Sequence, residues 1–395
     1  MFGLLILCVS LAVAVAAAIP VFVFAAQIFL AIRKGEPSLQ ALRRPSLAVI
    51  VPAHDEEQGI ASTLRSIAAQ LEDRDRVVVV ADNCSDRTAA IAAAAGAEVT
   101  SRHDPARRGK GFALDHGLEF VVRTGAPEVV VIVDADCQVG PGALARLAAL
   151  AVATGRPVQS AYLMTPSRSG HLAPIRNLAW FTKNYVRPLG WSRLGLPTQL
   201  TGSGMAFPTP LLQSVKLATD EIVEDLTLGL KLALRGSAPL FCPDAVVTSQ
   251  FPDDAGAEKS QRTRWEHGYL HSIVTHAPRL VYESLRQRSL TLLGMTLDLI
   301  VPPLSLLMLV TIMSVMMGAF ALLGAGAVVP FVVSSTVAAV FALAVLMLWS
   351  RFGRDLCSVE ELLKVPFYVF AKIPLYLKFI SDRQRAWVRT DRDPK

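Results

Sequence analysis

The chain has 395 residues, of which 52 % are hydrophobic and only 18 % are charged, and its formal net charge is +6. The low charged fraction argues against a wholly soluble protein and is typical of a folded domain joined to membrane-spanning segments. The positive charge is not arranged as a basic patch interleaved with aromatic residues, so we expect no nucleic-acid partner. The five cysteines are scattered and lack the spacing of a metal site.

Two long stretches contain no charged residue. The first, Phe2 to Ile32, is long enough to cross the roughly 30 Å hydrocarbon core of a bilayer. It lacks the positive start of a secretory signal peptide. The second, Leu299 to Ser350, has a turn-like middle at residues 324–330. We therefore predict three membrane spans, at 1–32 and, within 299–350, at about 301–323 and 331–349.

Basic residues follow the first span, precede the second and follow the third. The turn between the second and third spans has none. The positive-inside rule then predicts an integral protein of the inner (plasma) membrane, with the N-terminus outside and the middle region and C-terminus in the cytoplasm. The excess positive charge suits an anionic lipid leaflet. The flanking residues are Arg33, Lys34, Arg43, Arg44, Arg279, Arg286, Arg288, Arg351 and Arg354.

After a polar linker at 38–45, short β-branched runs alternate with helical patterns. This alternation predicts a mostly parallel sheet with helices on both faces. The first strand is not followed by a Gly-x-Gly-x-x-Gly motif, and the chain has no Walker-type phosphate loop, so the usual dinucleotide and ATP sites are absent. We expect strands at 47–51, 77–81, 98–100 and 129–133, and helices from 60 to 67, 88 to 95 and 112 to 124.

Beyond residue 136 the pattern is looser. We expect helices at 141–154 and 226–235, strands at 158–162 and near 200–207, and two short strands within 240–248. The basic, amphipathic stretch 265–293 is predicted to lie on the membrane surface. Residues 366–380 contain two prolines and are too few to span, so we expect them to lie in the membrane interface.

Acidic residues follow several of the predicted strands. Asp134 and Asp136 end the run at 129–133, and Glu56 and Asp82 follow the first two strands. Because the carboxyl ends of parallel strands meet at one edge of a sheet, these acids are expected to converge there. Two such carboxylates suit Mg²⁺ or Mn²⁺, and a basic turn containing Lys110 suits a diphosphate. Each residue alone could instead be a helix cap or a solvated turn residue.

The motifs, in this order, resemble those of the membrane-bound family-2 glycosyltransferases, the group that contains cellulose and hyaluronan synthases and many exopolysaccharide transferases. The resemblance covers about residues 47 to 270. It implies an α/β, Rossmann-like nucleotide-diphospho-sugar transferase domain of the GT-A type. The motifs are Val51-Pro-Ala-His-Asp-Glu56, Ala81-Asp82, Gly109-Lys110-Gly111, Asp134-Ala-Asp136, Thr201-Gly-Ser-Gly204, Glu224-Asp225 and Gln261-x-x-Arg264-Trp265.

The resemblance also implies a role for each motif. The metal ligands would be Asp136 and Asp134, holding Mg²⁺ or Mn²⁺, and Asp225, beside Glu224, would be the general base. His54 stands where the family usually has a tyrosine. The acceptor would contact Thr201, Gly202, Ser203 and Trp265. The nucleotide-sugar donor, with UDP favoured, would contact Ala53, His54, Glu56, Asp82, Lys110, Asp134, Gln261, Arg264 and Trp265.

The implied chemistry is coherent. A carboxylate can take the proton of an acceptor hydroxyl as the hydroxyl attacks. A divalent cation and an arginine stabilise the charge that develops on the leaving diphosphate. A single base and one in-line displacement would invert the anomeric centre, so an α-linked donor would give a β-linkage.

Three functional hypotheses remain open from the sequence. The first is a hexosyltransferase that adds a sugar to a lipid-linked or growing polysaccharide acceptor in exopolysaccharide synthesis. The second is a processive synthase that extrudes its own polymer, although three spans are few for a channel unless a homo-oligomer or an export partner contributes. The third is a catalytically silent, nucleotide-binding membrane scaffold. In each case we expect a cytoplasmic domain at 45–275, an interface segment at 276–298 and a basic tail within 351–395.

Overall fold

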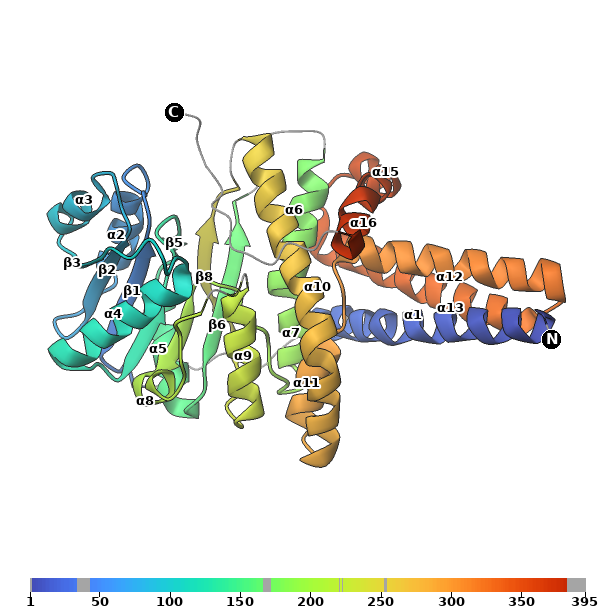
Figure 1. The fold of residues 1–395 in the computed structure, drawn as a ribbon, viewed down its shortest axis with the longest axis horizontal. Helices are drawn as coiled ribbons and strands as arrows, with labels where there is room; N and C mark the ends of the chain where they lie inside the picture. Colours follow the sequence, from blue (N-terminus) through green and yellow to red (C-terminus); the bar gives the residue numbers. More distant parts are fainter. Residues whose placement is uncertain are drawn as a thin grey trace.

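The computed structural model describes residues 2–33, 43–165, 172–219, 221, 223–251 and 254–381. An α/β domain occupies one end of the molecule, and three long apolar helices project from the other end (Figure 1). A layer of helices lies between these two parts. Residues 38–42 of the predicted linker at 38–45, and the basic tail from 382 onward, lie outside the described residues.

The α/β domain is built on an eight-stranded mixed sheet with the order β3-β2-β1-β4-β7-β6-β8-β5. The first four strands are parallel, as predicted, whereas β7 runs antiparallel to β4 and β6, and β5 runs antiparallel to β8. The strands are β1 (Leu47–Ala53), β2 (Arg76–Asp82), β3 (Glu98–Arg102), β4 (Val129–Ile132), β5 (Gln138–Val139), β6 (Val158–Met164), β7 (Met205–Pro208) and β8 (Leu240–Ser249).

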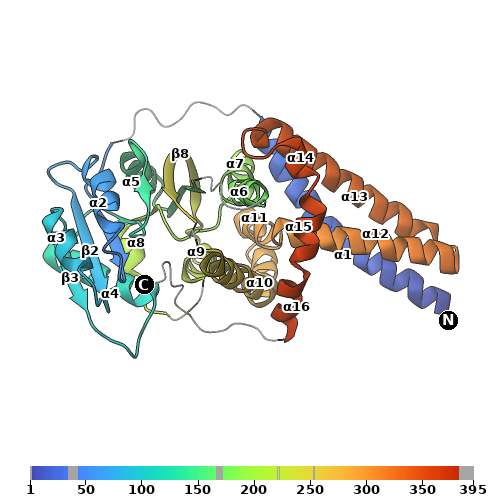
Figure 2. The same ribbon diagram turned by 90° about the horizontal axis from the view of Figure 1, so that it is seen from above.

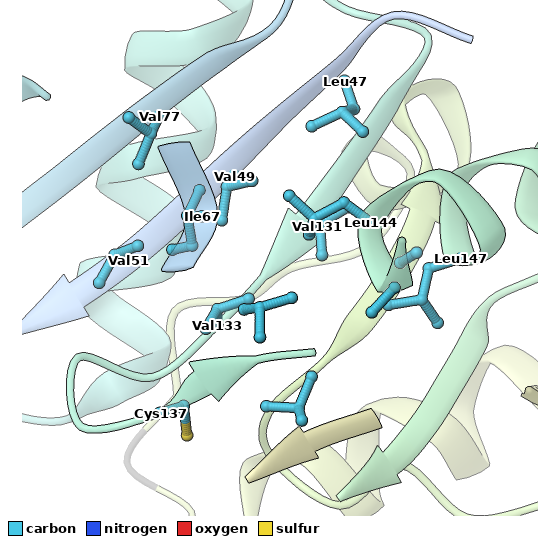
Figure 3. Packing of buried hydrophobic residues seen from close by; sticks show 14 of the residues in the cluster. Leu47, Val49, Val51, Ile67, Val77, Val131, Val133, Cys137, Leu144 and Leu147 are labelled. Carbon is cyan, nitrogen blue, oxygen red and sulfur yellow. The ribbon is translucent and has the colours of Figure 1, made fainter. Parts of the chain in front are cut away.

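The parallel strands are apolar on both faces because helices cover both faces. Val49 and Val131 point toward one side, where they pack with Ile67 and Leu144 (Figure 3). Their neighbours along the strands, among them Ile50, point to the opposite side. This alternation explains why the sequence shows near-continuous β-branched runs rather than a period of two.

One face of the sheet is covered by α2 (Ile60–Ala68) and α5 (Ala143–Thr154). The other is covered by α4 (Lys110–Gly125), α8 (Thr209–Gln213) and α9 (Glu224–Leu234). The short helix α3 (Thr88–Ala94) follows β2. The first β-α units thus match the predicted strands and helices closely.

Two features of the sheet differ from the sequence prediction. Residues 240–249 form one strand rather than two, because the register against β6 shifts after Cys242 and resumes at Val246. The extra residues form a bulge, which lets one strand continue past Pro243. The two-residue strand β5 was not predicted, since it is defined by pairing with β8 rather than by a local pattern.

Among the residues that the structure describes, three helices are long and apolar enough to cross a membrane. They are α1 (Phe2–Ile32), α12 (Leu304–Ala325) and α13 (Val328–Leu348), and they lie side by side (Figure 1). α12 is followed by its cap residue Gly326, whose φ of 64° allows the tight turn expected between the second and third spans. A π-helical turn, η2 (Trp349–Gly353), follows α13.

The intermediate layer contains α6 (Ala173–Phe181), the π-helix η1 (Thr182–Val186), α7 (Arg187–Ser192), α10 (Ala255–Arg286) and α11 (Leu290–Leu299). The domain boundary expected at residue 275 falls within α10, which runs on to Arg286. After η2 come α14 (Val359–Leu362), α15 (Val365–Ala371) and α16 (Ile373–Ser381), which cross the near end of the apolar bundle (Figure 2). α15 and α16 are each too short to span a bilayer.

Buried polar side chains join α1 to the α/β domain. Gln27 donates to Asp298 Oδ1 at 2.7 Å, and Arg187 donates to Gln27 Oε1 at 2.8 Å and to Asp298 Oδ1 at 3.0 Å. Gln199 donates to Asp298 Oδ2 at 2.6 Å. A Cβ atom on Gly190 would lie 1.9 Å from the Gln27 carbonyl oxygen, so only glycine permits this close approach of α7 to α1. We call the four polar residues Gln27, Arg187, Gln199 and Asp298 the anchor network.

Candidate active site

The loop after β4 carries Asp134 and Asp136 to the carboxyl edge of the parallel strands. Three hydrogen bonds hold the loop. Thr63 donates to the Ala135 carbonyl at 2.7 Å, the Asp134 amide donates to Ser203 Oγ at 3.0 Å, and Ser249 donates to Asp136 Oδ2 at 3.0 Å. The two carboxylates are therefore positioned by α2, by the segment before β7 and by the end of β8.

A cavity of about 460 Å³ opens beside this loop, and we call it the acidic cavity. It lies where the ends of β1, β2 and β4 meet, so the predicted convergence of acids at one sheet edge is found. Residues predicted to contact donor or metal line it together, namely Ala53, His54, Glu56, Asp82, Lys110, Asp134 and Asp136.

Asp82 is held by an arginine that the sequence analysis did not single out. Arg102 donates to Asp82 Oδ1 at 2.6 Å, and Asn83 donates to the same oxygen at 2.9 Å. The two charged residues are paired in register on β2 and β3. His54 Nδ1 lies 2.7 Å from the Asp82 carbonyl oxygen. Opposite charges at the ends of neighbouring strands were the sequence signal for this pair.

Lys110 lies at the junction of several motifs. Its Nζ is 2.5 Å from Asp134 Oδ1 and donates to the Gly202 carbonyl at 2.5 Å. Burial alone would lower the pKa of Lys110, but the carboxylates of Asp134, Glu224 and Asp225 outweigh burial and raise it. Lys110 is therefore a permanently charged ammonium. It links the loop after β4 that carries Asp134 and Asp136, which we call the metal-type loop, to the carboxylates of Glu224 and Asp225.

Glu224 and Asp225 form the first turn of α9, close to Lys110 and the Thr201–Ser203 segment. A Cβ atom on Gly202 would lie 3.3 Å from Asp225 Oδ2 and 3.8 Å from Lys110 Nζ. Burial and the neighbouring Asp225 raise the pKa of Glu224 to about 7, against the effect of Lys110. Burial also raises the pKa of Asp225. A carboxylate with a raised pKa is well suited to accept a proton near neutral pH.

The segment from Thr201 to Ser203 is fixed by Gln159, a residue that the sequence analysis missed. Gln159 is 2 % exposed; its Oε1 accepts from the Thr201 amide, and its Nε2 donates to the Ser203 carbonyl, both at 2.9 Å. Ser203 is fully buried and its hydroxyl supports Asp134. The Ser203 hydroxyl is thus used inside the protein, and acceptor contact by the Thr201–Ser203 segment stays a prediction.

Gln261, Arg264 and Trp265 lie on α10, as predicted. Gln261 and Trp265 line a second cavity of about 720 Å³ rather than the acidic cavity. Trp265 packs against Trp180 of α6, with ring centroids 5.1 Å apart and the ring planes tilted by 40°. These two residues thus lie on the side of the domain that faces the apolar helices. We call this space the membrane-side cavity.

The motif order and this geometry can be compared with known proteins. The family model described as "Glycosyltransferase like family 2" matches residues 45–268, more than half of the chain. The chain belongs to glycosyltransferase family 2. The match begins just before β1 and ends within α10. The family, the enzyme class and the fold class of this family-2 glycosyltransferase are therefore those that its sequence predicted.

Several curated proteins are similar to this glycosyltransferase. A poly-beta-1,6-N-acetyl-D-glucosamine synthase of Staphylococcus aureus is 22 % identical over 261 residues, covering 62 % of this chain and 60 % of the synthase. The probable glycosyltransferase YdaM of Bacillus subtilis is 26 % identical, covering 58 % and 56 %. The low-salt glycan biosynthesis hexosyltransferase Agl6 of Haloferax volcanii is 39 % identical over 95 residues, covering 24 % and 21 %. The chain spans about three fifths or less of these relatives.

A solved structure shares the fold of this glycosyltransferase. The mannosyltransferase PcManGT of Pyrobaculum calidifontis, in complex with GDP-Man and Mn²⁺, superposes with a TM-score of 0.54 at 20 % identity. The similarity covers 87 % of this chain and 99 % of that one. The likeness therefore extends beyond the catalytic domain of the family-2 enzyme.

The loop after β4 provides ligand atoms that fit a divalent metal ion. Oxygens of Asp134 and Asp136 and the sulfur of Cys137 lie within 4.8 Å of one another. Burial raises the pKa of the Cys137 thiol well above its usual range, and the adjacent carboxylates add to this shift. The thiol is therefore neutral, and the donor set of this glycosyltransferase consists of two hard carboxylates, which suit Mg²⁺ or Mn²⁺.

Proposed function

We propose that this family-2 enzyme transfers a hexose from a nucleotide-diphosphate donor to a hydroxyl of a lipid-linked or growing glycan acceptor, with inversion at the anomeric carbon. One observation carries the proposal. Lys110 contacts Asp134 of the metal-type loop on one side and the Gly202 segment beside Asp225 on the other. The groups needed at the leaving diphosphate and at the attacking hydroxyl thus meet around one side chain.

In the proposed reaction, an acceptor hydroxyl oxygen forms a bond to the anomeric carbon while the bond from that carbon to the diphosphate breaks. Asp225 takes the hydroxyl proton, and the diphosphate leaves with the electron pair. Lys110 stabilises the charge of the leaving group through its ammonium. Because one carboxylate acts as the base and no covalent intermediate is needed, the anomeric centre inverts.

The donor is proposed to lie in the acidic cavity, with its nucleoside toward Asp82 and His54 and its diphosphate toward Lys110 and Asp134. Mg²⁺ or Mn²⁺, held by Asp136 and Asp134, would supply charge neutralisation for the diphosphate. The Mn²⁺ and GDP-Man named for PcManGT support a metal-dependent reaction, and both UDP-sugars and GDP-sugars are candidate donors.

The enzyme is proposed to act at the cytoplasmic face of the plasma membrane. In the part of the chain that the structure describes, three helices are long and apolar enough to span a membrane. Basic residues such as Arg351 and Arg354 flank the ends nearest the α/β domain. The positive-inside rule supports a cytoplasmic position for that end. The acceptor is proposed to contact Thr201 and Trp265; the Thr201 hydroxyl oxygen is buried without a hydrogen bond among the described residues.

The test is product analysis by mass spectrometry. Purified protein in lipid nanodiscs receives a panel of UDP- and GDP-sugars, Mn²⁺ or Mg²⁺, and either no acceptor or a polyprenyl-diphosphate sugar. We expect one added sugar, seen only with the lipid acceptor and formed far more slowly by Asp225→Asn. A ladder of repeats without that acceptor would instead identify a processive synthase. Failure to consume any donor would refute the proposal and favour the silent scaffold.

A further inference from the structure

The membrane-side cavity has an apolar part and a charged part. Its apolar walls come from α1, α12 and α13, with Phe24, Met308 and Phe341 among the lining side chains. The end toward the α/β domain is lined by α6, η1 and α10, which supply Lys183 and Trp265. The cavity thus runs from the predicted membrane interior to the catalytic domain. Its volume of about 720 Å³ is in the range of ligand sites.

Most of the basic residues that line this cavity are paired. Arg176 and Arg262 both contact Glu258, at 2.6 Å and 3.3 Å. Arg187 is paired with Asp298 in the anchor network, and Lys372 is paired with Glu266. These pairs hold the helices of the cavity wall together.

Lys183 is different, because it has no ion pair among the residues that the structure describes. Its ammonium lies 4.7 Å from the centre of the Tyr269 ring, a cation–π contact. Lys183 belongs to the π-helix η1, and such turns are frequent at functional sites. Burial lowers the pKa of Lys183, and Asp225 is the first among the charges that oppose this shift. Lys183 is thus a partly buried cation at the end of the cavity toward the α/β domain, where an anion would stabilise it.

We propose that the membrane-side cavity binds a lipid-linked saccharide acceptor, with Lys183 holding the phosphate or diphosphate group and the lipid chain lying against α12 and α13. This inference rests on the proposed function, because it names the class of acceptor for the same reaction. The apolar walls match a hydrocarbon chain and the unpaired ammonium matches an anionic group. A saccharide attached to that group would extend toward Asp225.

The experiment measures binding rather than transfer. The probes are a polyprenyl phosphate, the polyprenol of the same chain length and inorganic phosphate. Each is titrated into the full chain in nanodiscs, and tryptophan fluorescence reports binding through Trp180 and Trp265. The variants are Lys183→Met, Lys183→Gln and Lys183→Arg, with Lys259→Met as the matched control because that lysine is exposed and does not line the cavity. Retained Mn²⁺-dependent nucleotide binding verifies folding.

We expect the wild type to bind the polyprenyl phosphate about tenfold more tightly than the polyprenol. Lys183→Met and Lys183→Gln should lose this preference while binding the polyprenol as before, and Lys183→Arg and Lys259→Met should keep it. Equal binding of phosphate and alcohol by the wild type, or an unchanged preference in both neutral variants, would overturn the inference. Binding of inorganic phosphate as tight as that of the lipid would overturn the lipid assignment.

The two proposals can fail separately. If the lipid preference depends on Lys183 but no donor sugar is ever transferred, the lipid site stands and the proposed function fails. If sugar is transferred equally well to neutral acceptors and Lys183→Met changes neither binding nor transfer, the function stands and the lipid site fails.

Discussion

Gln159 is predicted to control the active site without touching a substrate. Its amide group forms hydrogen bonds with the backbone of the Thr201–Ser203 segment, at both Thr201 and Ser203. The Ser203 hydroxyl in turn accepts a hydrogen bond from the Asp134 amide. Gln159→Leu keeps a side chain of similar length but removes both hydrogen bonds. The Thr201 amide is then left without its acceptor in a partly buried position, and the Ser203 carbonyl keeps only a 3.5 Å contact from Ser160.

The magnitude follows from these contacts. An unsatisfied buried polar group costs about 1–3 kcal/mol, so the loss of one full and one partly replaced bond gives about 2–4 kcal/mol. For a domain of this size that corresponds to a fall in Tm of roughly 5–10 °C. A displacement of the segment by about 1 Å would lower kcat on the order of a hundredfold.

The assay combines thermal melting in nanodiscs with sugar transfer at saturating donor. Gln159→Glu is informative because it retains an acceptor for Thr201 but loses the donor to Ser203, so we expect an intermediate loss of activity. Gln138→Leu is the control, because Gln138 is an exposed glutamine of the same sheet. Melting and kcat of Gln159→Leu within error of the control would refute the reasoning.

Four further predictions concern the carboxylates and the lysine turn. Asp225→Asn should lower the rate of transfer about 10²–10⁴-fold and leave nucleotide binding by calorimetry unchanged; full activity would remove the assigned base. Gly111→Ala should raise the donor KM about tenfold, because the new Cβ would lie 2.5 Å from the Leu217 carbonyl oxygen and push the Lys110 turn away; an unchanged KM would contradict the close packing. Without metal or donor, the pKa of Glu224 in the folded protein is near 7, whereas the ordinary pKa of a glutamate in the unfolded chain is about 4.5. Between these two pH values the folded protein therefore keeps a proton that the unfolded chain has released. The wild type should therefore lose stability relative to Glu224→Gln as the pH rises from about 4.5 to about 7. If plots of Tm against pH for the two proteins run parallel over this range, the prediction is wrong. EDTA should abolish transfer, and Mn²⁺ or Mg²⁺ should restore it; activity that persists in EDTA would exclude a metal-dependent reaction.

The parallel half of the sheet could be predicted because its signals are local. The runs 47–51, 77–81 and 129–133 are β-branched on both faces, and acids follow each at the same edge. The motif residues of the acidic cavity come together for this reason. The three apolar helices were likewise evident from length and the absence of charge.

Features that depend on distant contacts could not be predicted in the same way. Gln159 interrupts an apolar strand, which was a signal, but its partners at 201 and 203 are set by β6 and β7 being neighbours in the sheet. The single strand at 240–249 needs a bulge against β6. The placement of Gln261 and Trp265 in the second cavity depends on how α10 packs against α6, which no spacing along the helix specifies.

The anchor network has a consequence for how the protein is made. Gln27 and Asp298 are 271 positions apart, so the first apolar helix is synthesised long before its partner. A chain emerging from the ribosome must insert α1 into the membrane with Gln27 lacking the carboxylate that later accepts its hydrogen bond. Docking of the catalytic domain can be completed only after α11 has been translated, since Asp298 lies near its end. Assembly is thus a late step of biogenesis. In ribosome-bound chains truncated before residue 298, the contact between α1 and α7 should be open to protease and should be disrupted by detergent.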